Sequence, residues 1–138
     1  MQLSAEWITG FVDGEGCFHV GINDRDDMAG GAQVLPEFTV VQYERDAKVL
    51  HALKAAFGCG VVRVNHADRL AYRVRNHAHL LERILPFFEK HPLKTSKRVA
   101  FVKFRRVVHM MERGEHLTPD GVERIRAIAE RMNRGQSR

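Results

Sequence analysis

The sequence has 138 residues, of which 44% are hydrophobic and 28% charged, and its net charge at neutral pH is +5. This length and composition predict one globular domain, residues 1–134, followed by a flexible tail at 135–138. They exclude a membrane protein, because no apolar run approaches the roughly 18 residues of a membrane-spanning helix. With no N-terminal signal pattern, we expect an intracellular chain, in the cytoplasm or an organellar matrix, with Cys17 and Cys59 as reduced thiols.

Charge is distributed unevenly along the chain. Through Asp46 the sequence has nine acidic and two basic residues, a net charge of −7, whereas from Ala47 onward it has 20 basic and eight acidic residues, a net charge of +12. A basic body of this kind predicts a polyanionic partner, most often nucleic acid. The alternative is a well-solvated basic surface without a partner.

The first predicted element is a helix over residues 4–14 that ends among glycines and carboxylates. Ser4 can cap its N-terminus. Asp13 and Glu15 then fall at the negative end of the helix dipole, where basic residues are the norm, and a broken local rule of this kind points to function. The alternative is a core helix with a glycine cap and two solvated acids.

Two glycines on the same helix, Gly10 and Gly14, are four residues apart, so they leave a stripe without side chains on one face. Trp7 and Phe11 also fall on one face at helical spacing. Another backbone could approach closely along this stripe.

Two strands are predicted next, at 17–23 and 33–42, because apolar and polar residues alternate in both. The loop between them, 24–32, contains Asp24, Asp26, Asp27 and a Gly-Gly pair. Pro36 lacks an N–H group, which favours an edge position or a bulge in the second strand.

The remaining chain predicts a helix at 46–57, a β-hairpin of strands 61–65 and 70–75, and further helices. Asn76 caps a helix to about Leu85, where Pro86 breaks or restarts it. The last two helices cover 97–113 and 119–133, the latter with Thr118-Pro119 as its start. This order predicts an α+β fold, an antiparallel or mixed sheet with helices on one face.

The uncovered sheet face is predicted to carry side chains that can donate to bases and phosphates, a pattern typical of a DNA-reading surface. The alternative is an ordinary solvated face, and Glu37 and the three loop aspartates would repel phosphates. The predicted DNA-binding residues are His19, Gly21, Asn23, Arg25, Gln33, Leu35, Glu37, Thr39, Arg63, Asn65, Arg69, Ala71, Arg73 and Arg75.

The stretch Ile8-Thr9-Gly10-Phe11-Val12-Asp13-Gly14-Glu15-Gly16 resembles the LAGLIDADG motif of homing endonucleases. It keeps Gly10, Asp13, Gly16 and, as Glu15, an acid at the eighth place. The family unit has the element order predicted above, so the resemblance covers nearly the whole chain and implies the αββαββα LAGLIDADG-type fold with a saddle-shaped antiparallel sheet. The chain is most similar to the single-motif, group I intron-encoded members that act as homodimers.

The resemblance also implies a site. Glu15 corresponds to the metal-binding acid, usually Asp, with the Gly14 carbonyl as a further ligand for Mg²⁺ (or Mn²⁺). Gln42 resembles the residue that orients water, and Lys94 the lysine near the scissile phosphate, with Lys97 as the alternative. Asp13 is expected to cap or hydrogen-bond at the helix end rather than bind metal.

The implied function is that of a site-specific homing endonuclease, which makes a double-strand break in a long pseudo-palindromic DNA site by metal-dependent phosphodiester hydrolysis. A DNA duplex has two strands to cut, and the chain has one motif. We therefore expect a homodimer whose motif helices pack through Trp7, Gly10, Phe11 and Gly14. The alternative is an RNA maturase, which would bind intron RNA, or a nucleic-acid-binding protein of the same fold that does not cleave.

Overall fold

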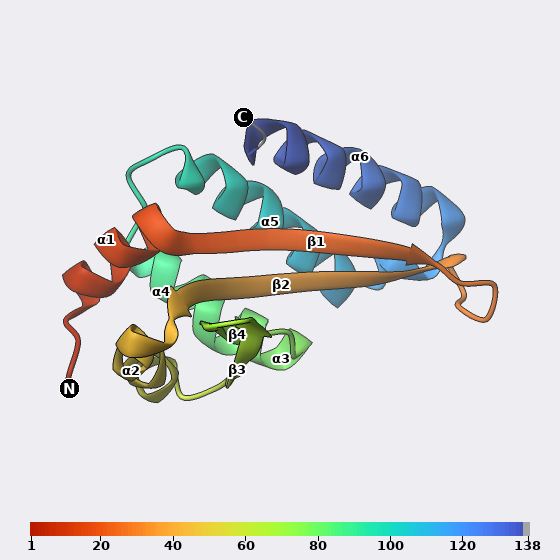
Figure 1. Ribbon diagram of the computed structural model, residues 1–138. Coiled ribbons are helices and arrows are strands. Elements are labelled where there is room, and N and C mark those ends of the chain that lie inside the picture. The colour runs from red at the N-terminus through yellow and green to blue at the C-terminus, as the bar shows by residue number, and fades with distance from the viewer. Residues whose placement is uncertain (137–138) are drawn as a thin grey trace. The chain divides into compact units, whose positions relative to one another are not determined.

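The computed structural model describes residues 1–136. The chain divides into two compact units, one made of residues 1–17 and 38–98 and the other of residues 18–37 and the chain from Val99 onward. The strands form one sheet in the order β1-β2-β4-β3 (Figure 1). The predicted α+β class is confirmed, whereas the prediction of a single domain stays a prediction.

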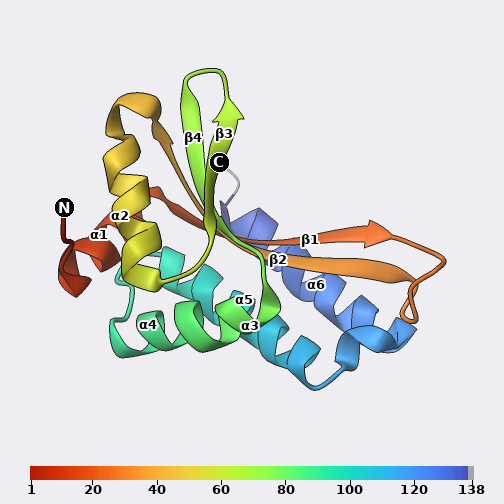
Figure 2. The same cartoon turned by 90° about the horizontal axis from the view of Figure 1, so that it is seen from below.

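The first unit contains the motif helix, the last half of β2, the β3–β4 hairpin and five further helical elements. α2 lies beside the hairpin (Figure 2). The elements are α1 Ala5–Glu15, β2 Ala32–Tyr43, η1 Glu44–Asp46, α2 Ala47–Phe57, β3 Val61–His66, β4 Arg69–Val74, α3 His77–His79, a π-helical turn η2 Leu80–Ile84, and α4 Leu85–Lys90.

An aromatic cluster forms the core of this unit. The ring of Phe38 lies 5.9 Å from that of Phe57 and 5.7 Å from that of Phe88, both edge-on. Tyr72, fully buried, stacks on Phe57 and donates its hydroxyl hydrogen to the carbonyl of Cys59 at 2.8 Å. Strand β2 therefore packs against α2 and α4 through side chains that alternate with those on its other face.

Pro86 does not end the helix that Asn76 begins, because a wide π-helical turn precedes it. Proline in a regular helix clashes with the carbonyl four residues earlier and removes a hydrogen bond. The π turn over Leu80–Ile84 accommodates Pro86 in the first turn of α4, and the chain stays helical as far as Lys90. The predicted end near Leu85 is therefore wrong, and the alternative of a restart at the proline is closer.

The second unit contains β1 Gly16–Asp24 from Phe18 onward, the first half of β2, α5 Lys97–Glu112 from Val99 onward, η3 Glu115–Leu117 and α6 Pro119–Gln136. The buried ring of Phe18 lies 5.3 Å from Phe101 and 5.2 Å from Phe104. Helix α5 therefore packs on the apolar face of β1. Thr118 caps α6 by accepting the N–H of Gly121, as predicted.

The paired registers explain the position of Pro36 within β2. β4 pairs with β2 from Phe38 to Tyr43, so Pro36 precedes the segment in which its missing N–H would matter to that pairing. α6 extends to Gln136, which includes the first part of the predicted tail, and residues 137–138 lie outside the described residues. Within residues 1–136, no helix is both long and apolar enough to cross a membrane.

Candidate active site and nucleic-acid interface

The carboxylate of Asp13 joins the end of the motif helix to the segment that starts α5. Its Oδ2 accepts the backbone N–H of Lys94 at 2.9 Å, and its Oδ1 accepts both the N–H and the hydroxyl of Thr95, at 3.1 and 2.8 Å. Three donors compensate for a carboxylate placed at the negative end of a helix dipole. Asp13 thus has the hydrogen-bonding role that the sequence predicted for it.

The same junction determines where Lys97 lies. The Thr95 hydroxyl oxygen accepts the backbone N–H of Lys97 at 3.2 Å, so it caps the first turn of α5. The Lys97 side chain turns back, and its ammonium group donates to the carbonyl of Gly16, directly after α1. A cation is favoured there, because the last carbonyls of a helix carry partial negative charge.

Two opposing effects act on the pKa of Asp13. Burial raises the pKa, but the hydrogen bonds from Lys94 and Thr95, with the positive charge of Lys94, outweigh it and hold the pKa below the ordinary 3.8. The carboxylate is therefore fully ionised at neutral pH and keeps all three donors.

Glu15, the last residue of α1, is exposed, and within residues 1–136 its carboxylate has no hydrogen-bond or ion-pair partner. Gly16 follows without a side chain, because a Cβ there would lie 2.6 Å from Cγ1 of Val12. The carboxylate and the carbonyls of the last helical turn offer the oxygen ligands that Mg²⁺ prefers. The described residues hold no group of three or more His, Cys, Asp or Glu side chains that would bind a metal alone.

The two candidate lysines and Gln42 have different surroundings. Lys97 is half-buried with its amine at the motif, whereas Lys94 is exposed and contributes a backbone N–H. Gln42 is half-buried near the end of β2, paired with Leu70, on the face that carries Val40. Lys97 thus has its ammonium group at the end of the motif helix, whereas Lys94 acts on Asp13 through its backbone N–H and its positive charge.

The outer face of α1 is open. Ile8, Thr9 and Val12 are buried, whereas Trp7 is 44% exposed and stacks on Phe11 with 4.8 Å between ring centroids. A Cβ on either Gly10 or Gly14 would have no neighbouring atom within 4 Å. All four predicted interface residues thus lie outside the helix's buried face.

In the first unit, register places Thr39, Arg63 and Arg73 on one face of the sheet. Thr39 pairs with Arg73, and Arg63 pairs with Ala71, two residues before Arg73 on β4. Asn65 accepts a hydrogen bond from Arg73 at 3.0 Å. Ala71 shares this face but is fully buried, so the prediction that it contacts DNA is wrong.

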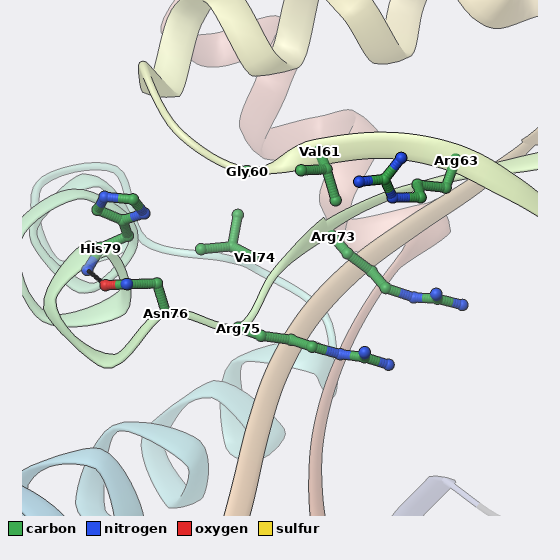
Figure 3. A pocket seen from close by; sticks show the side chains of 8 residues that line it. All are labelled: Gly60, Val61, Arg63, Arg73, Val74, Arg75, Asn76 and His79. Carbon is green, nitrogen blue, oxygen red and sulfur yellow. Dashed lines mark hydrogen bonds between the residues drawn. The ribbon is translucent and has the colours of Figure 1, made fainter.

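A hollow of about 380 Å³ lies where β3 begins and β4 ends, next to the start of α3 (Figure 3). Figure 3 shows the side chains of Arg73 and Arg75 extending in the same direction. Asn76, the residue after Arg75, accepts the N–H of His79 and so caps α3. The residues that line the hollow are Gly60, Val61, Arg63, Arg73, Val74, Arg75, Asn76 and His79.

Tyr43 lies on the same sheet face as Thr39 and Arg73 and contacts two arginines there. The sequence alone did not predict this role for Tyr43. Its ring lies 4.7 Å from the guanidinium carbon of Arg45 and 4.9 Å from that of Arg69, and its hydroxyl accepts a hydrogen bond from Arg69 at 3.1 Å. The only hint of such a contact in the sequence is that Arg45 follows Tyr43 closely, at the end of the strand. Arg69, already among the predicted DNA-binding residues, lies on β4 opposite Tyr43 on β2, and its contact with Tyr43 follows only from this register.

The second unit has its own polar strand face. His19, Asn23 and Leu35 are exposed, and Gly21, Gln33 and Glu37 are half-buried, while the intervening residues of both strands turn mainly inward. Arg25 forms a two-pronged ion pair with Asp27, at 3.0 and 2.6 Å. The loop aspartates that argued against DNA binding are thus partly neutralised within the loop.

The Asp13 junction predicts a pH-dependent effect on stability. Replacing Asp13 with Asn removes one acceptor oxygen and the charge, so we expect the free energy of unfolding at pH 7 to fall by about 1 kcal/mol. Since the folded-state pKa is lowered, the Asp13 contribution is fully present above the unfolded value of 3.8 and is lost as the pH falls through the folded value. Urea denaturation at pH 7 and about pH 3 measures both differences.

The matched control is Asp26→Asn, at an exposed loop residue whose side chain has no hydrogen-bond or ion-pair partner within residues 1–136, and it should change stability by less than about 0.5 kcal/mol. An equal loss for Asp13→Asn at both pH values would show that the carboxylate charge is not what holds the junction.

Solved structures resemble the chain over nearly its full length. The homing endonuclease I-TnaI is 53% identical with a TM-score of 0.90, and the match covers 98% of this chain and 97% of that one. The LAGLIDADG homing endonuclease I-SmaMI, in a structure with cleaved DNA, is 30% identical with a TM-score of 0.92, over 97% of this chain and 45% of that one.

Curated relatives are longer. A probable intron-encoded endonuclease of Neurospora crassa is 30% identical over 138 residues, which are 99% of this chain and 30% of that protein. DNA endonuclease I-CvuI of Chlorella vulgaris is 32% identical over 91 residues, 64% of this chain and 56% of that protein. The chain therefore spans less than two thirds of either relative.

The family model of the LAGLIDADG endonucleases matches residues 8–108, from the start of the motif into α5. That range contains the Asp13 junction, Glu15, Gln42, Lys97 and the arginine-bearing hairpin. The chain belongs to the LAGLIDADG endonuclease family.

Proposed function

We propose that this protein is a site-specific homing endonuclease that makes a double-strand break in a long pseudo-palindromic DNA site. The observation that carries the proposal is the exposed, unpaired Glu15 at a helix end that Asp13 anchors and Lys97 approaches. The arginine-bearing sheet face supports DNA as the substrate. The named activities of I-TnaI and I-SmaMI support the same class of reaction.

Glu15 and the carbonyl of Gly14 are the residues that would hold Mg²⁺ or Mn²⁺. A single protein carboxylate suffices for a hard cation that also binds phosphate oxygens and water. Such an ion activates water and neutralises charge on the phosphate. The electronegative end of α1 favours a cation at this position.

Lys97, rather than Lys94, is the lysine that we assign to the scissile phosphate. Its ammonium group is already at the end of the motif helix, where it can stabilise the charge that develops on phosphorus. Gln42 orients the attacking water through its amide and does not deprotonate it, because an amide is not a base at neutral pH. The backbone of Lys94 supports the site through Asp13.

The basic sheet face reads DNA in the major groove. Arginine can donate two hydrogen bonds to one guanine, and Arg63 and Arg73 lie on the same face of adjacent strands. Tyr43, between two guanidinium groups, fixes Arg69 and thus adds a positioned cation to the surface.

A homodimer accounts for two cuts by a chain with one motif. Under two-fold symmetry each copy supplies one Glu15, and the exposed face of α1 becomes an isologous contact. The open space at Gly10 and Gly14 lets two helices approach, and Trp7 and Phe11 add apolar area at the contact. The names of the intron-encoded relatives support an intracellular or organellar location.

Replacing Glu15 with Gln is expected to reduce double-strand cleavage below detection and to leave sequence-specific binding intact. The neutral amide keeps the size of the side chain but is a poor ligand for a divalent cation. Cleavage of the native target region by purified protein, with Mg²⁺ and with EDTA, measures the first effect. A binding titration in Ca²⁺ measures the second.

The control for this variant is Glu89→Gln, which removes an acid from α4 that is also exposed. It should cleave at the wild-type rate. Wild-type cleavage by Glu15→Gln would refute the site assignment. Tight binding of intron RNA, with no DNA cleavage by the wild-type protein, would instead indicate a maturase.

The two lysines make a second prediction. Lys97→Ala should lower the single-turnover cleavage rate by about 10²–10³-fold, the usual cost of one electrostatic stabiliser of the transition state. Lys94→Ala should lower it by less than about tenfold, because the Asp13 contact uses the backbone of Lys94. The reverse order of rates would restore Lys94 as the residue at the phosphate.

A further inference from the structure

Three exposed side chains gather where strand β2 ends and the β3–β4 hairpin turns. Tyr43 is the last residue of β2, and it pairs with Arg69, the first residue of β4. Arg45 follows in the η1 turn. All three residues belong to the first unit, and we call them the Tyr43 cluster.

The ring of Tyr43 contacts both arginines of the cluster. The guanidinium carbon of Arg45 lies 4.7 Å from the ring centroid, and that of Arg69 lies 4.9 Å from it. Such contacts are favourable because the face of an aromatic ring attracts a cation. Arg69 also donates to the Tyr43 hydroxyl at 3.1 Å, so this oxygen accepts one hydrogen bond and its own hydrogen can be donated elsewhere.

The backbone beneath the cluster is fixed as well. The N–H of Glu44 donates to the carbonyl of Asp68 at 2.8 Å, which ties the η1 turn to the turn of the hairpin. Glu44 directly precedes Arg45, and Asp68 directly precedes Arg69. This hydrogen bond therefore holds the backbones of the two arginines close together before any ligand binds.

The two positive charges of the cluster have no acidic partner within residues 1–136. Neither Arg45 nor Arg69 forms an ion pair with a carboxylate there, and the neighbouring acids Glu44 and Asp68 meet through their backbones. Two like charges beside one ring repel each other, although water and salt screen the repulsion. An anion that accepts from both guanidinium groups would remove it.

The chemistry of the cluster fits a phosphate better than a base edge. A guanine edge takes one arginine, which donates to O6 and N7. A phosphodiester has a full negative charge and two non-bridging oxygens, so two guanidinium groups and a hydroxyl can donate to it together.

We propose that the Tyr43 cluster is a binding site for one backbone phosphate of the DNA. Arg45 and Arg69 donate to the non-bridging oxygens, and Tyr43 orients both arginines and adds its hydroxyl hydrogen. The cluster fixes the position of the duplex and reads no base. This inference rests on the proposed endonuclease function, and it gives roles to Tyr43 and Arg45, which were not among the residues predicted to bind DNA.

The test is a set of binding titrations in Ca²⁺ with duplexes of the native target region, in which a neutral methylphosphonate replaces one phosphate at a time. Arg45→Gln, Arg69→Gln and Tyr43→Phe are compared with the wild type. The matched control is Lys54→Gln, which removes one positive charge from an exposed side chain on α2 in the same unit.

Each arginine variant should bind the unmodified target roughly tenfold more weakly, and the slope of log K against log salt should fall by about two, one for each copy in the dimer. One methylphosphonate in each half-site should weaken the wild type and have no further effect on either arginine variant, because that contact is already lost. Tyr43→Phe should bind about threefold more weakly, since it loses one hydrogen-bond donor. Lys54→Gln should match the wild type, and preference among single base-pair changes should be the same in all variants.

Two results would overturn the inference. One is a methylphosphonate profile in which Arg45→Gln and Arg69→Gln stay as sensitive as the wild type at every phosphate, or lose sensitivity at different phosphates. The other is loss of discrimination at one base pair in Arg69→Gln, which would make Arg69 a base reader. With either result, cleavage of the target by the wild type would leave the proposed function intact, whereas a wild type that neither binds nor cleaves the target would refute both.

Discussion

The site depends on one carboxylate that binds three donors at the end of a helix. Asp13 ties the last turn of α1 to residues 94–95, and this tie directs the first turn of α5 so that Lys97 reaches the carbonyl of Gly16. An acid at this end of a helix is unfavourable by itself, because it faces the negative end of the dipole. The hydrogen bonds reverse that preference, and they leave the next acid, Glu15, exposed and available for chemistry.

Local rules predicted the elements that bear on the site. Alternation in β1 and β2 identified the buried and exposed residues, since one face of each strand packs on aromatic side chains. Two acids, Asp13 and Glu15, lie at the negative end of the α1 dipole, where they are unfavourable, and this indicated the functional end of the helix. The resemblance to the family motif then implied metal binding for Glu15 and hydrogen bonding for Asp13, and the structure gives Asp13 its predicted hydrogen-bonding role.

What sequence could not supply were contacts between residues far apart in the chain. The position of Lys97 depends on Thr95, whose hydroxyl caps the first turn of α5 and donates to Asp13. The sequence alone does not reveal that Asp13 and Thr95 are in contact. Ala71 has the right register for a DNA contact, but its short side chain is completely covered. Arg69 on β4 donates a hydrogen bond to Tyr43 on the neighbouring strand β2, and no periodicity in either strand predicts that pair.

In the homodimer that we propose, each copy contributes one Glu15 and cuts one strand of the same duplex. The most direct measurement uses mixed dimers, made by co-expressing differently tagged wild-type and Glu15→Gln chains and purified through both tags. On a supercoiled plasmid that carries the target, these dimers should nick a single strand and accumulate open circles. Linear product formed at the wild-type rate, or no mixed dimer recoverable under conditions in which the wild type cleaves, would contradict the claim.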